Sequence, residues 1–307
     1  MQKNHIALSK NEIDEIQNIL GNDYTLCNSY GVCGAHCMCI GIRHKDGTKY
    51  ILKRPIKENH EWLEFQISRH EDVSEIFSIA YQESGVGFET IDCYGNQHYI
   101  SRYLGEPLGQ SITEMDPPIQ KKIANQLAQF LGSIHKNSSL QNKPFQSFEY
   151  PSLSVINAYF SAFLSKDEKN IVTEIFKKIE EYRNISFPSV FIHGDFRSDN
   201  ILYCKDTGVL SVIDFECSGF SNILREFALD AMSSLGFSYS FWFMVIDAYS
   251  RIGNTQITPE LVRTLMAASI IHEYGRCAIV ARASGLELNK RCQHMKIRLK
   301  SLFEEFR

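Results

Sequence analysis

The spacing of apolar residues alternates between helical and strand-like periods in the first third of the chain. A helix is predicted over residues 9–20, because Ser9 and Glu12 have capping-box spacing and the apolar positions after them share one face. Asp46-Gly47 lies between two apolar runs and indicates a hairpin turn. The other elements predicted here are strands over 37–43, 49–54, 87–92 and 97–104 and a helix over 58–70. This pattern indicates a small sheet with one or two helices against it.

Helical spacing dominates after Gly105. The strongest pattern spans residues 117–136, where apolar residues recur every three or four positions. Further helices are predicted over 153–163, 168–182, 237–249, 259–283 and 288–306. The exception is a strand-rich island at residues 190–214. The change of period divides the chain into an expected N-terminal lobe of residues 1–104 and a C-terminal lobe of residues 105–307.

Composition and charge narrow the class of protein. The chain has 307 residues, enough for two lobes, and a net charge of −4 with no basic block, which argues against a nucleic-acid partner. Its nine cysteines are scattered and residues 1–10 are polar, so we expect a cytoplasmic protein with free thiols. The apolar segment 237–249 is shorter than a membrane span of about 20 residues, so we expect a buried helix and no membrane partner. The sequence leaves the oligomeric state open.

Three polar residues stand at the ends of apolar runs in the strand-rich island. Asp195 comes shortly after the first run, Asn200 precedes the second, and Asp214 ends the third. A hairpin from Asn200 to Asp214, turning at residues 206–208, would bring these two side chains side by side. Asp195 would lie one loop away. The island therefore predicts a cluster of two carboxylates and one amide.

These residue types at this spacing suit phosphoryl transfer. The charge on a transferring phosphoryl group must be neutralised by a metal, usually Mg²⁺, and Asn200 and Asp214 offer the oxygen ligands that Mg²⁺ prefers. Asp195 is placed to accept a hydrogen bond from the acceptor hydroxyl and to take its proton. Asp-x-x-x-x-Asn followed by a strand ending in Asp-Phe matches the kinase arrangement. Taken singly, Asp195 could belong to a turn and Asp214 could cap a helix, but the combined spacing favours catalysis.

The island also resembles a known family. It contains His193-Gly194-Asp195, then Asn200-Ile201-Leu202, then Val212-Ile213-Asp214-Phe215-Glu216. This succession is similar to the signature of the aminoglycoside phosphotransferases and their relatives, among them choline, homoserine and methylthioribose kinases.

The resemblance implies an α+β, protein-kinase-like fold with a sheet-rich N-lobe and a mainly helical C-lobe. It further implies that ATP or GTP and Mg²⁺ bind between the lobes, and that a hydroxyl of a small molecule accepts the γ-phosphoryl group. An aminoglycoside-type antibiotic, a sugar and an amino alcohol all remain open as acceptors.

The resemblance extends to residues that would hold the nucleotide. Lys53 ends a predicted strand, as in the family, and is expected to reach the α- and β-phosphates. Glu64 on the next predicted helix is the expected ion-pair partner of Lys53, with Glu61 and Glu58 as alternatives because helix phase is poorly fixed by sequence.

The segment 99–108 looks like the hinge of the family, where backbone groups meet the base of the nucleotide. The Ser101 carbonyl and the Tyr103 amide are the candidates. Because these contacts are made by the main chain, they set no preference between adenine and guanine.

The chain departs from the family pattern in two places. The phosphate-covering segment lacks G-x-G-x-x-G and offers only Ser29, Gly31 and Gly34 to present backbone N–H groups. Where the family often has Asp-Leu-Ala after the metal-binding aspartate, this chain has Glu226-Phe227-Ala228, which puts the support of the catalytic loop in question.

Neighbouring residues are expected to play supporting roles. His193 is expected to brace the catalytic loop, and His135 at the end of a predicted helix is expected to be structural. Arg197 would either contact phosphate or form an internal ion pair, and the sequence does not decide between these.

Other functions compete with small-molecule phosphotransfer. A protein kinase is disfavoured, because Phe215-Glu216 follows Asp214 in place of Phe-Gly and His-Gly-Asp replaces His-Arg-Asp. The remaining alternative is a catalytically inactive nucleotide-binding module that acts through a partner. Its support is the glycine-poor loop and Glu226.

Two further groups of residues carry weaker signals. Cys33, Cys37 and Cys39 have the spacing C-x-x-x-C-x-C without a clear fourth metal ligand, so free thiols are expected there. Glu273 and Tyr274 are candidates for binding the acceptor, with an ordinary amphipathic helix as an equal alternative.

Overall fold

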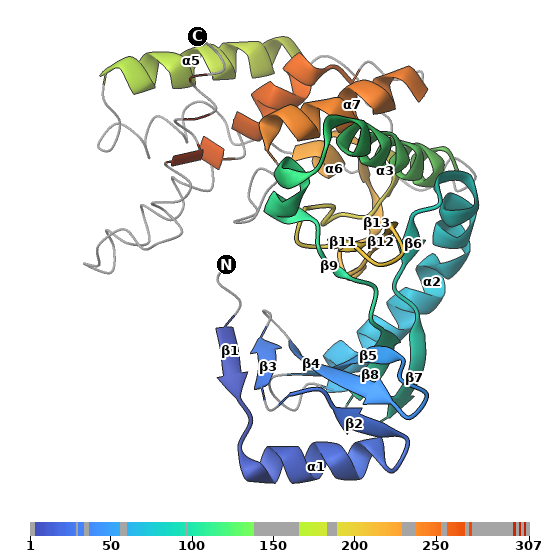
Figure 1. Cartoon of the computed structure of the whole chain (residues 1–307). Coiled ribbons are helices and arrows are strands. Elements are labelled where there is room, and N and C mark those ends of the chain that lie inside the picture. The colour runs from blue at the N-terminus through green and yellow to red at the C-terminus, as the bar shows by residue number, and fades with distance from the viewer. Residues whose placement is uncertain are drawn as a thin grey trace.

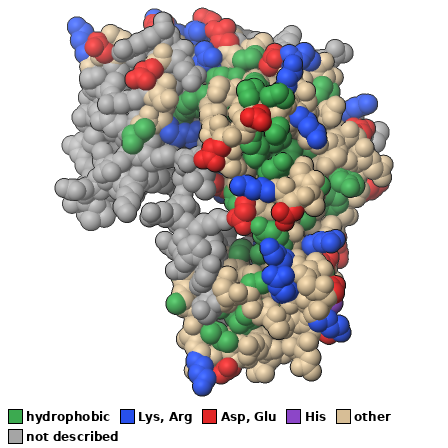
Figure 2. Space-filling model, viewed as in Figure 1, with side chains coloured by type: hydrophobic (Ala, Val, Ile, Leu, Met, Phe, Trp, Pro, Cys, Tyr) green, Lys and Arg blue, Asp and Glu red, His purple; other side chains and the backbone are tan. Residues whose placement is uncertain are grey.

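The structure is a computed structural model that describes residues 4–28, 30–33, 37–55, 60–95, 98–137, 166–182, 189–228, 238–252, 257–267, 270–271, 297–298, 301 and 304. Within these residues, a part built on an antiparallel sheet lies below a part built mainly of helices, and the long helix α2 (His60–Ser84) runs from one to the other (Figure 1). Figure 2 shows acidic and basic side chains gathered on the visible face where the two parts meet.

The first part is a sheet in which every neighbouring pair of strands is antiparallel. Its order is β1 (Asn4–Ala7), β3 (Tyr30–Cys33), β4 (Cys37–His44), β5 (Lys49–Pro55), β8 (His98–Arg102) and β7 (Ile91–Gly95), with β2 (Tyr24–Leu26) also paired to β4. The predicted strands over 37–43 and 49–54 are confirmed as β4 and β5.

The helix α1 (Lys10–Leu20) packs on one face of this sheet. Its predicted capping box is confirmed, because the Ser9 hydroxyl accepts a hydrogen bond from the Glu12 amide and the Glu12 carboxylate accepts one from the Ser9 amide. The apolar core on this face consists of Leu8, Ile16, Leu20, Ile40, Ile42, Leu52 and Ile100. Since side chains alternate along a strand, the residues between these positions in β4, β5 and β8 lie on the opposite face.

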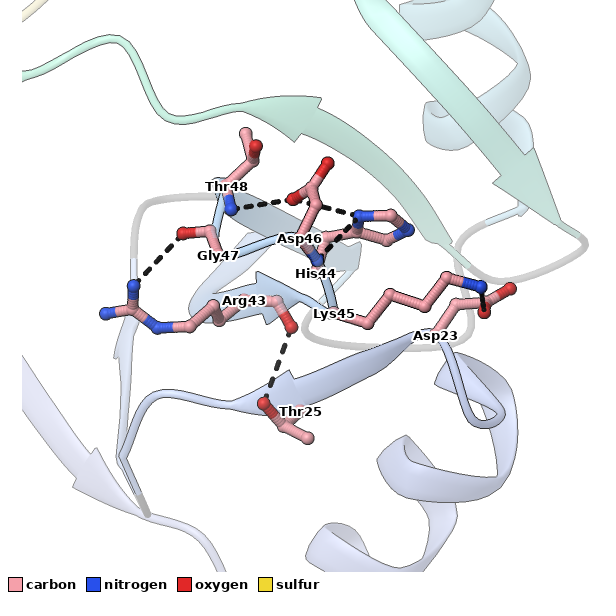
Figure 3. A network of polar contacts seen from close by, with 8 residues as sticks. All are labelled: Asp23, Thr25, Arg43, His44, Lys45, Asp46, Gly47 and Thr48. Atoms are coloured by element: carbon pink, nitrogen blue, oxygen red, sulfur yellow. Dashed lines mark hydrogen bonds and ion pairs between the residues drawn. The ribbon is translucent and has the colours of Figure 1, made fainter.

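The turn between β4 and β5 is the one that Asp46-Gly47 predicts (Figure 3). The Asp46 carboxylate accepts a hydrogen bond from the Thr48 amide at 2.8 Å and lies 3.0 Å from Nδ1 of His44. Gly47 adopts a φ of +91°, a conformation that favours a residue without Cβ. These contacts fix the turn, and the turn fixes the register that sets Cys39 opposite Lys53.

The helix α2 is longer than the helix predicted over 58–70. Its buried positions continue at helical spacing beyond residue 70, and Phe77 and Ala80 are fully buried. The Phe77 ring centroid lies 4.6 Å from that of Phe215 and 5.5 Å from that of Phe130. The second half of α2 therefore belongs to the core of the helical part and ties that part to the first sheet.

A second sheet lies between the first sheet and the helices (Figure 1). Its order is β6 (Gly87–Phe88), β12 (Val209–Val212), β11 (Ile201–Cys204) and β9 (Glu106–Pro107). The strands β11 and β12 form the predicted hairpin and turn at residues 205–208. The strand β6 pairs with β12 in parallel. Two more strands, β10 (Ser189–Ile192) and β13 (Gly219–Asn222), form a separate antiparallel pair.

The prediction of one strand over 87–92 is wrong. Residues 87 and 88 pair with β12 in the second sheet, whereas β7 begins at Ile91 and pairs with β8 in the first sheet. The chain therefore crosses from one sheet to the other within this run. It crosses again after β8, where Gly105 has a φ of +129° and a Cβ would lie 2.5 Å from the Tyr203 carbonyl oxygen. Gly105 is the residue that permits this close approach.

Helices form most of the remaining described chain. They are the short 3-10 helix η1 (Gly109–Glu114), α3 (Pro117–Asn137), α5 (Lys166–Tyr182), α6 (Leu224–Ala228), α7 (Tyr239–Ile252) and the helical residues 259–267. The predicted helices over 117–136, 168–182 and 237–249 are confirmed as α3, α5 and α7. The predicted helix over 153–163 lies outside the described residues, and those over 259–283 and 288–306 fall largely outside them.

The helix α7 is the buried apolar helix that the sequence predicts. Trp242, Val245 and Ile246 are fully buried, and the Trp242 indole donates to the Phe227 carbonyl at 3.1 Å. Among the described helices, none combines the length and the apolar character that crossing a membrane requires.

Candidate active site

Asp195, Asn200 and Asp214 come together at one end of β12. Ile213 donates its amide to the Asn200 carbonyl at 3.0 Å, which extends the hairpin by one residue pair. Nδ2 of Asn200 donates to Oδ2 of Asp195 at 2.8 Å and to its backbone carbonyl at 3.0 Å. Asp214 lies near enough to Asp195 for that charge to raise the Asp214 pKa. The three residues that the spacing predicts as a cluster are therefore neighbours.

One oxygen of the Asp195 carboxylate, Oδ2, is held by hydrogen bonds from neighbouring side chains. Nε of Arg197 donates to Oδ2 of Asp195 at 3.0 Å, and the Asn200 amide meets the same oxygen. The open question about Arg197 is thereby answered, because it forms an internal ion pair. Among the described residues, both hydrogen bonds to this carboxylate go to Oδ2. Within the described residues, Oδ1 is therefore the oxygen that a further donor could meet.

Asp214 is the strained and charge-sensitive member of the cluster. Its φ of +71° is the one positive φ of a non-glycine residue in the part of the chain that the structure describes. Burial, together with the carboxylates of Glu216, Asp195 and Glu89, raises the pKa of Asp214 to about 6 against the opposing charge of Lys53. A cation beside Asp214 would relieve this excess of negative charge.

The loop before Asp195 is fixed by its backbone. Gly194 has a φ of +80°, and a Cβ at this position would lie 2.1 Å from the Cys217 carbonyl oxygen. Nε2 of His193 lies 3.0 Å from the Ile213 carbonyl, and the Ser218 hydroxyl donates to the His193 carbonyl at 3.0 Å. His193 thus spans from the loop to the end of β12, as a bracing residue should.

Glu226 supplies the support that the departure from Asp-Leu-Ala puts in question. Its fully buried carboxylate accepts hydrogen bonds from the His193 amide at 2.6 Å and the Gly194 amide at 3.2 Å. Nε2 of His135 lies 3.7 Å from the same carboxylate, and Nδ1 of His135 lies 2.7 Å from the Tyr249 hydroxyl. Glu226 therefore fixes the loop that carries Asp195 to the helical core.

The predicted pairing of Lys53 with Glu64 is wrong. Nζ of Lys53 lies 2.8 Å from Oε1 and 3.0 Å from Oε2 of Glu89, whereas Glu64 is exposed on α2. The alternative Glu61 is also exposed, and Glu58 lies outside the described residues. Burial would lower the pKa of Lys53, but the charge of Glu89 outweighs it and holds that pKa well above its ordinary value. Lys53 is therefore a buried, charged residue with a buried carboxylate partner.

Glu89 reaches Lys53 because of the parallel pairing of β6. The Glu89 amide donates to the Val212 carbonyl at 2.9 Å, which places Glu89 beside the end of β12. Oε1 of Glu89 also accepts a hydrogen bond from the Ser101 hydroxyl at 2.8 Å. The signal in the sequence is an acidic residue between Phe88 and Ile91 in a strand-like run, where a buried charge needs a partner.

Two polar residues of α2 that the sequence analysis missed also face the site. Nε2 of Gln66 donates to Oε2 of Glu216 at 2.8 Å, and the His70 ring centroid lies 5.2 Å from that of Phe215. Both residues are buried and stand four positions apart, so they share one helix face. They connect α2 to the segment that follows Asp214.

The predicted hinge contacts are only partly available. The Tyr103 amide donates to the Lys49 carbonyl at 3.1 Å, so in this structure that amide is bonded within the first sheet, and its contact with a nucleotide base stays a prediction. The physical reason is that pairing between β5 and β8 continues one residue beyond β8. The Tyr103 hydroxyl donates to Oε1 of Glu106 at 2.7 Å.

The remaining candidate residues lie in or beside undescribed segments. Gly31 belongs to β3, where it pairs with Ile6, and Ser29 and Gly34 lie outside the described residues. Glu273 and Tyr274 also lie outside them.

Comparisons with known proteins agree on one family. The model of a phosphotransferase enzyme family matches residues 93–251, which is more than half of the chain. No curated protein matches the sequence.

Solved structures of similar fold include three phosphotransferases. The GDP complex of aminoglycoside 2′-phosphotransferase-IIIa is 13% identical, with 96% of this chain and 97% of that chain covered and a TM-score of 0.66. The streptomycin–ATP complex of APH(2″)-IIa is 14% identical, with 97% of each chain covered and a TM-score of 0.53. Macrolide 2′-phosphotransferase MphH from Brachybacterium faecium is 13% identical, with 94% and 96% covered and a TM-score of 0.55. The expected α+β, kinase-like fold is thereby confirmed.

The two hydrogen bonds to Glu226 predict a cost for its neutralisation. We expect Glu226→Gln to lower the free energy of unfolding by about 2–4 kcal/mol, because charge-assisted bonds to buried amides are lost and an amide NH₂ is buried in their place. Urea denaturation measures this. Glu260→Gln is the control, because Glu260 pairs with Lys178 at the surface and should change stability by less than about 1 kcal/mol. Equal losses in the two variants would show that Glu226 does not hold the loop.

The correction from Glu64 to Glu89 can be tested with a matched pair of variants. We expect Glu89→Gln to lower the free energy of unfolding by about 3 kcal/mol, since it leaves Lys53 buried without a countercharge. Glu64→Gln should change it by less than about 0.5 kcal/mol, because the side chain is exposed. Denaturation curves of both variants at neutral pH decide the matter. A larger effect at Glu64 than at Glu89 would restore the original pairing.

Proposed function

The chain belongs to the phosphotransferase enzyme family, and on this premise we propose that it transfers the γ-phosphoryl group of ATP or GTP to a hydroxyl group of a small molecule. The observation that carries the proposal is the convergence of Asp195, Asn200 and Asp214 at the end of β12, beside the Lys53–Glu89 pair. These groups provide what phosphoryl transfer needs, which is a proton acceptor, oxygen ligands for a metal and a cation for the phosphates.

Asn200 and Asp214 are the proposed ligands of Mg²⁺. The side chains present suit Mg²⁺. Nδ2 of Asn200 donates to Asp195, so the amide oxygen of Asn200 is the atom that can bind a cation. The excess of carboxylates around Asp214 also favours a dication there. When bound, Mg²⁺ would neutralise the negative charge of the triphosphate during transfer.

Asp195 is the proposed catalytic base. Arg197 and Asn200 hold Oδ2, so the carboxylate stays oriented while Oδ1 can accept a hydrogen bond from the acceptor hydroxyl. The proton of that hydroxyl would pass to Asp195 as the oxygen bonds to phosphorus. Most of the acceleration would come from alignment and charge neutralisation, with no covalent enzyme intermediate.

Lys53 is the proposed nucleotide-binding cation. Its pairing with Glu89 keeps the ammonium charged and fixed in position. The Ser101 carbonyl remains the proposed contact to the base, and Ser29 and Gly31 remain proposed members of the phosphate-covering segment. Either nucleotide fits the proposal, because similar structures were obtained with GDP in one case and ATP in another.

The acceptor is proposed to be an aminoglycoside-type antibiotic, a sugar or an amino alcohol. The similar folds of aminoglycoside and macrolide phosphotransferases support this class, at identities of 13–14%. We further propose an N-lobe of residues 1–104 over a C-lobe of residues 105–307, and action in the cytoplasm, where scattered thiols stay reduced.

A catalytically inactive nucleotide-binding module is the alternative, and one of its two supports has weakened. Glu226 binds both amides of the loop that carries Asp195, so its presence does not argue for a damaged site. Metal-dependent turnover of nucleotide separates the two functions.

Substitution of Asp195 tests the proposed reaction. A panel of aminoglycosides, sugars and amino alcohols is incubated with ATP or GTP and Mg²⁺, and product is measured by mass spectrometry. For the acceptor that turns over, we expect Asp195→Ala to lower kcat by about 10²–10⁴-fold, since the proton acceptor is lost. Asp206→Ala, an exposed carboxylate in the β11–β12 turn, is the matched control and should keep kcat. Full kcat in Asp195→Ala would rule out its role as base.

The raised pKa of Asp214 predicts a pH dependence for Mg²⁺. A carboxyl with a pKa of about 6 is protonated below that pH and cannot bind the metal until the proton leaves. We therefore expect the Mg²⁺ concentration for half-maximal activity to rise about tenfold per unit as pH falls below about 6, and to level off above it. Saturating Mg²⁺ should offset the loss. A constant half-maximal concentration between about pH 5 and 8 would contradict the assignment.

The same pKa gives the metal-free protein the opposite trend in stability. Because the folded state raises the Asp214 pKa above its ordinary value, the folded state binds this proton more tightly than the unfolded state does. The contribution of Asp214 to the free energy of unfolding therefore increases as pH falls from about 6 towards about 4. Asp214→Asn should remove this contribution when the two metal-free proteins are compared by urea denaturation.

A further inference from the structure

Cys37 and Cys39 form a pair of thiols on β4. They stand two positions apart in one strand, so both side chains lie on the same face of the sheet. Their sulfur atoms are 3.9 Å apart, and neither belongs to a disulfide. Both side chains are half-buried, which leaves them accessible to small solutes.

This thiol pair lies on the face of the first sheet that carries Lys53. Cys39 is directly opposite Lys53 in the β4–β5 register, and directly opposed residues share a face. The intervening residue Met38 packs against the apolar core under α1, on the other face of the sheet, and so does the next residue, Ile40. The charges of Lys53 and Asp214 both act on the two thiols. The thiol pair is therefore a neighbour of the candidate active site, although the proposed reaction does not use it.

The spacing of the pair suits a metal better than a disulfide. Two residues of a strand lie about 6.8 Å apart at Cα, which is the upper limit of about 4.4–6.8 Å for residues that form a disulfide. In a tetrahedral site with metal–sulfur bonds of about 2.3 Å, two sulfur atoms lie about 3.8 Å apart. The observed 3.9 Å between the sulfur atoms matches this value.

We propose that Cys37 and Cys39 bind one soft divalent cation, Zn²⁺ or Cd²⁺, through both sulfur atoms at a position beside Lys53. Two S–H protons leave as two metal–sulfur bonds form, so the net charge of the site does not change. Lys53 therefore meets no additional positive charge. Among the described residues, no third His, Cys, Asp or Glu completes a metal-binding group, so water would occupy the other coordination positions.

The electrostatics of the pair favour release of the first proton. The hydrogen bond between the two thiols and the charge of Lys53 lower the pKa of Cys39 to about 7 against the effect of burial. The same hydrogen bond raises the pKa of Cys37, so the second proton leaves when the metal binds. Metal binding should consequently strengthen as pH rises.

A cation at this position would inhibit the enzyme. It would occupy space beside the ammonium group that is proposed to hold the triphosphate, so metal and nucleotide would compete. This consequence rests on the proposed function, whereas binding of the metal does not.

Titration with CdCl₂ tests the binding. The reduced, chelator-treated protein is titrated without oxygen, and the ultraviolet sulfur-to-cadmium charge-transfer absorption is recorded. This absorption reports sulfur ligands only, so cadmium at Asn200 and Asp214 contributes nothing to it. We expect Cys37→Ser/Cys39→Ser to lose an amplitude that corresponds to one bound Cd²⁺. Cys27→Ser/Cys204→Ser also removes two thiols and should keep that amplitude.

A second measurement uses the unaltered protein, in case the double variant does not fold. One equivalent of Cd²⁺ should slow alkylation of Cys37 and Cys39 by iodoacetamide at least tenfold, while alkylation of Cys27 and Cys204 continues unchanged. Peptide mass spectrometry measures all four rates. An equal loss of absorption in the two double variants, or unprotected Cys37 and Cys39, would overturn the proposal.

Inhibition is measured separately from binding. With Mg²⁺ and nucleotide fixed, the fraction of phosphotransfer lost on adding CdCl₂ is compared between the wild type and Cys37→Ser/Cys39→Ser, and Zn²⁺ is tested in the same way. The wild type should lose at least tenfold more of its rate than the variant. Cadmium binding without such a difference would overturn the inhibitory role alone, and a protein without phosphotransfer would overturn the proposed function while the absorption result stands.

Discussion

The candidate active site depends on the way one short strand, β12, is hydrogen-bonded on both sides. Its neighbour β6 runs parallel and its neighbour β11 runs antiparallel, so the end of β6, the beginning of β11 and the end of β12 all meet at one edge. The residues at that edge are Glu89, Asn200 and Asp214. Two backbone bonds hold them there, from Glu89 to Val212 and from Ile213 to Asn200. Charged and amide groups distant in sequence thus converge because of strand direction alone.

The charges at this edge make the metal-free site electrostatically unbalanced. The charges of Asp195, Glu89 and Glu216 act on Asp214 and are opposed there by the charge of Lys53. The imbalance is visible in the raised pKa of Asp214, and the same residue has a strained φ. Such features reduce stability, and proteins retain them where function requires them. A magnesium–nucleotide complex brings both a dication and a polyanion, which is the combination that this arrangement of one lysine and several carboxylates can accommodate.

Local patterns in the sequence were sufficient for some of this site and not for the rest. The hairpin and its three polar residues could be predicted because Asn200 and Asp214 are joined by a short turn, and a turn sets its own register. Glu89 could not be predicted, because its position depends on a parallel pairing with a strand more than a hundred residues away. The hydrogen bond of the Tyr103 amide could not be predicted for a similar reason, since its partner is the Lys49 carbonyl of another strand. The capping box of α1 and the buried face of α3 could be predicted without knowing which distant strands pair.

The partner of Lys53 also determines how the two parts of the molecule are coupled. Lys53 belongs to the first sheet, whereas Glu89 follows β6 in the second sheet, so their ion pair crosses from one sheet to the other. Nζ of Lys53 donates to Oε2 of Glu89 at 3.0 Å and lies 2.8 Å from Oε1, so both oxygens of this carboxylate hold the ammonium group. Tyr99 also forms a hydrogen bond with the Lys53 side chain, so the ammonium group is held from both sheets. Had Glu64 been the partner, the position of Lys53 would follow the position of α2. With Glu89, it follows the same strand edge that holds Asn200 and Asp214, so the proposed phosphate-binding and metal-binding groups share one rigid support.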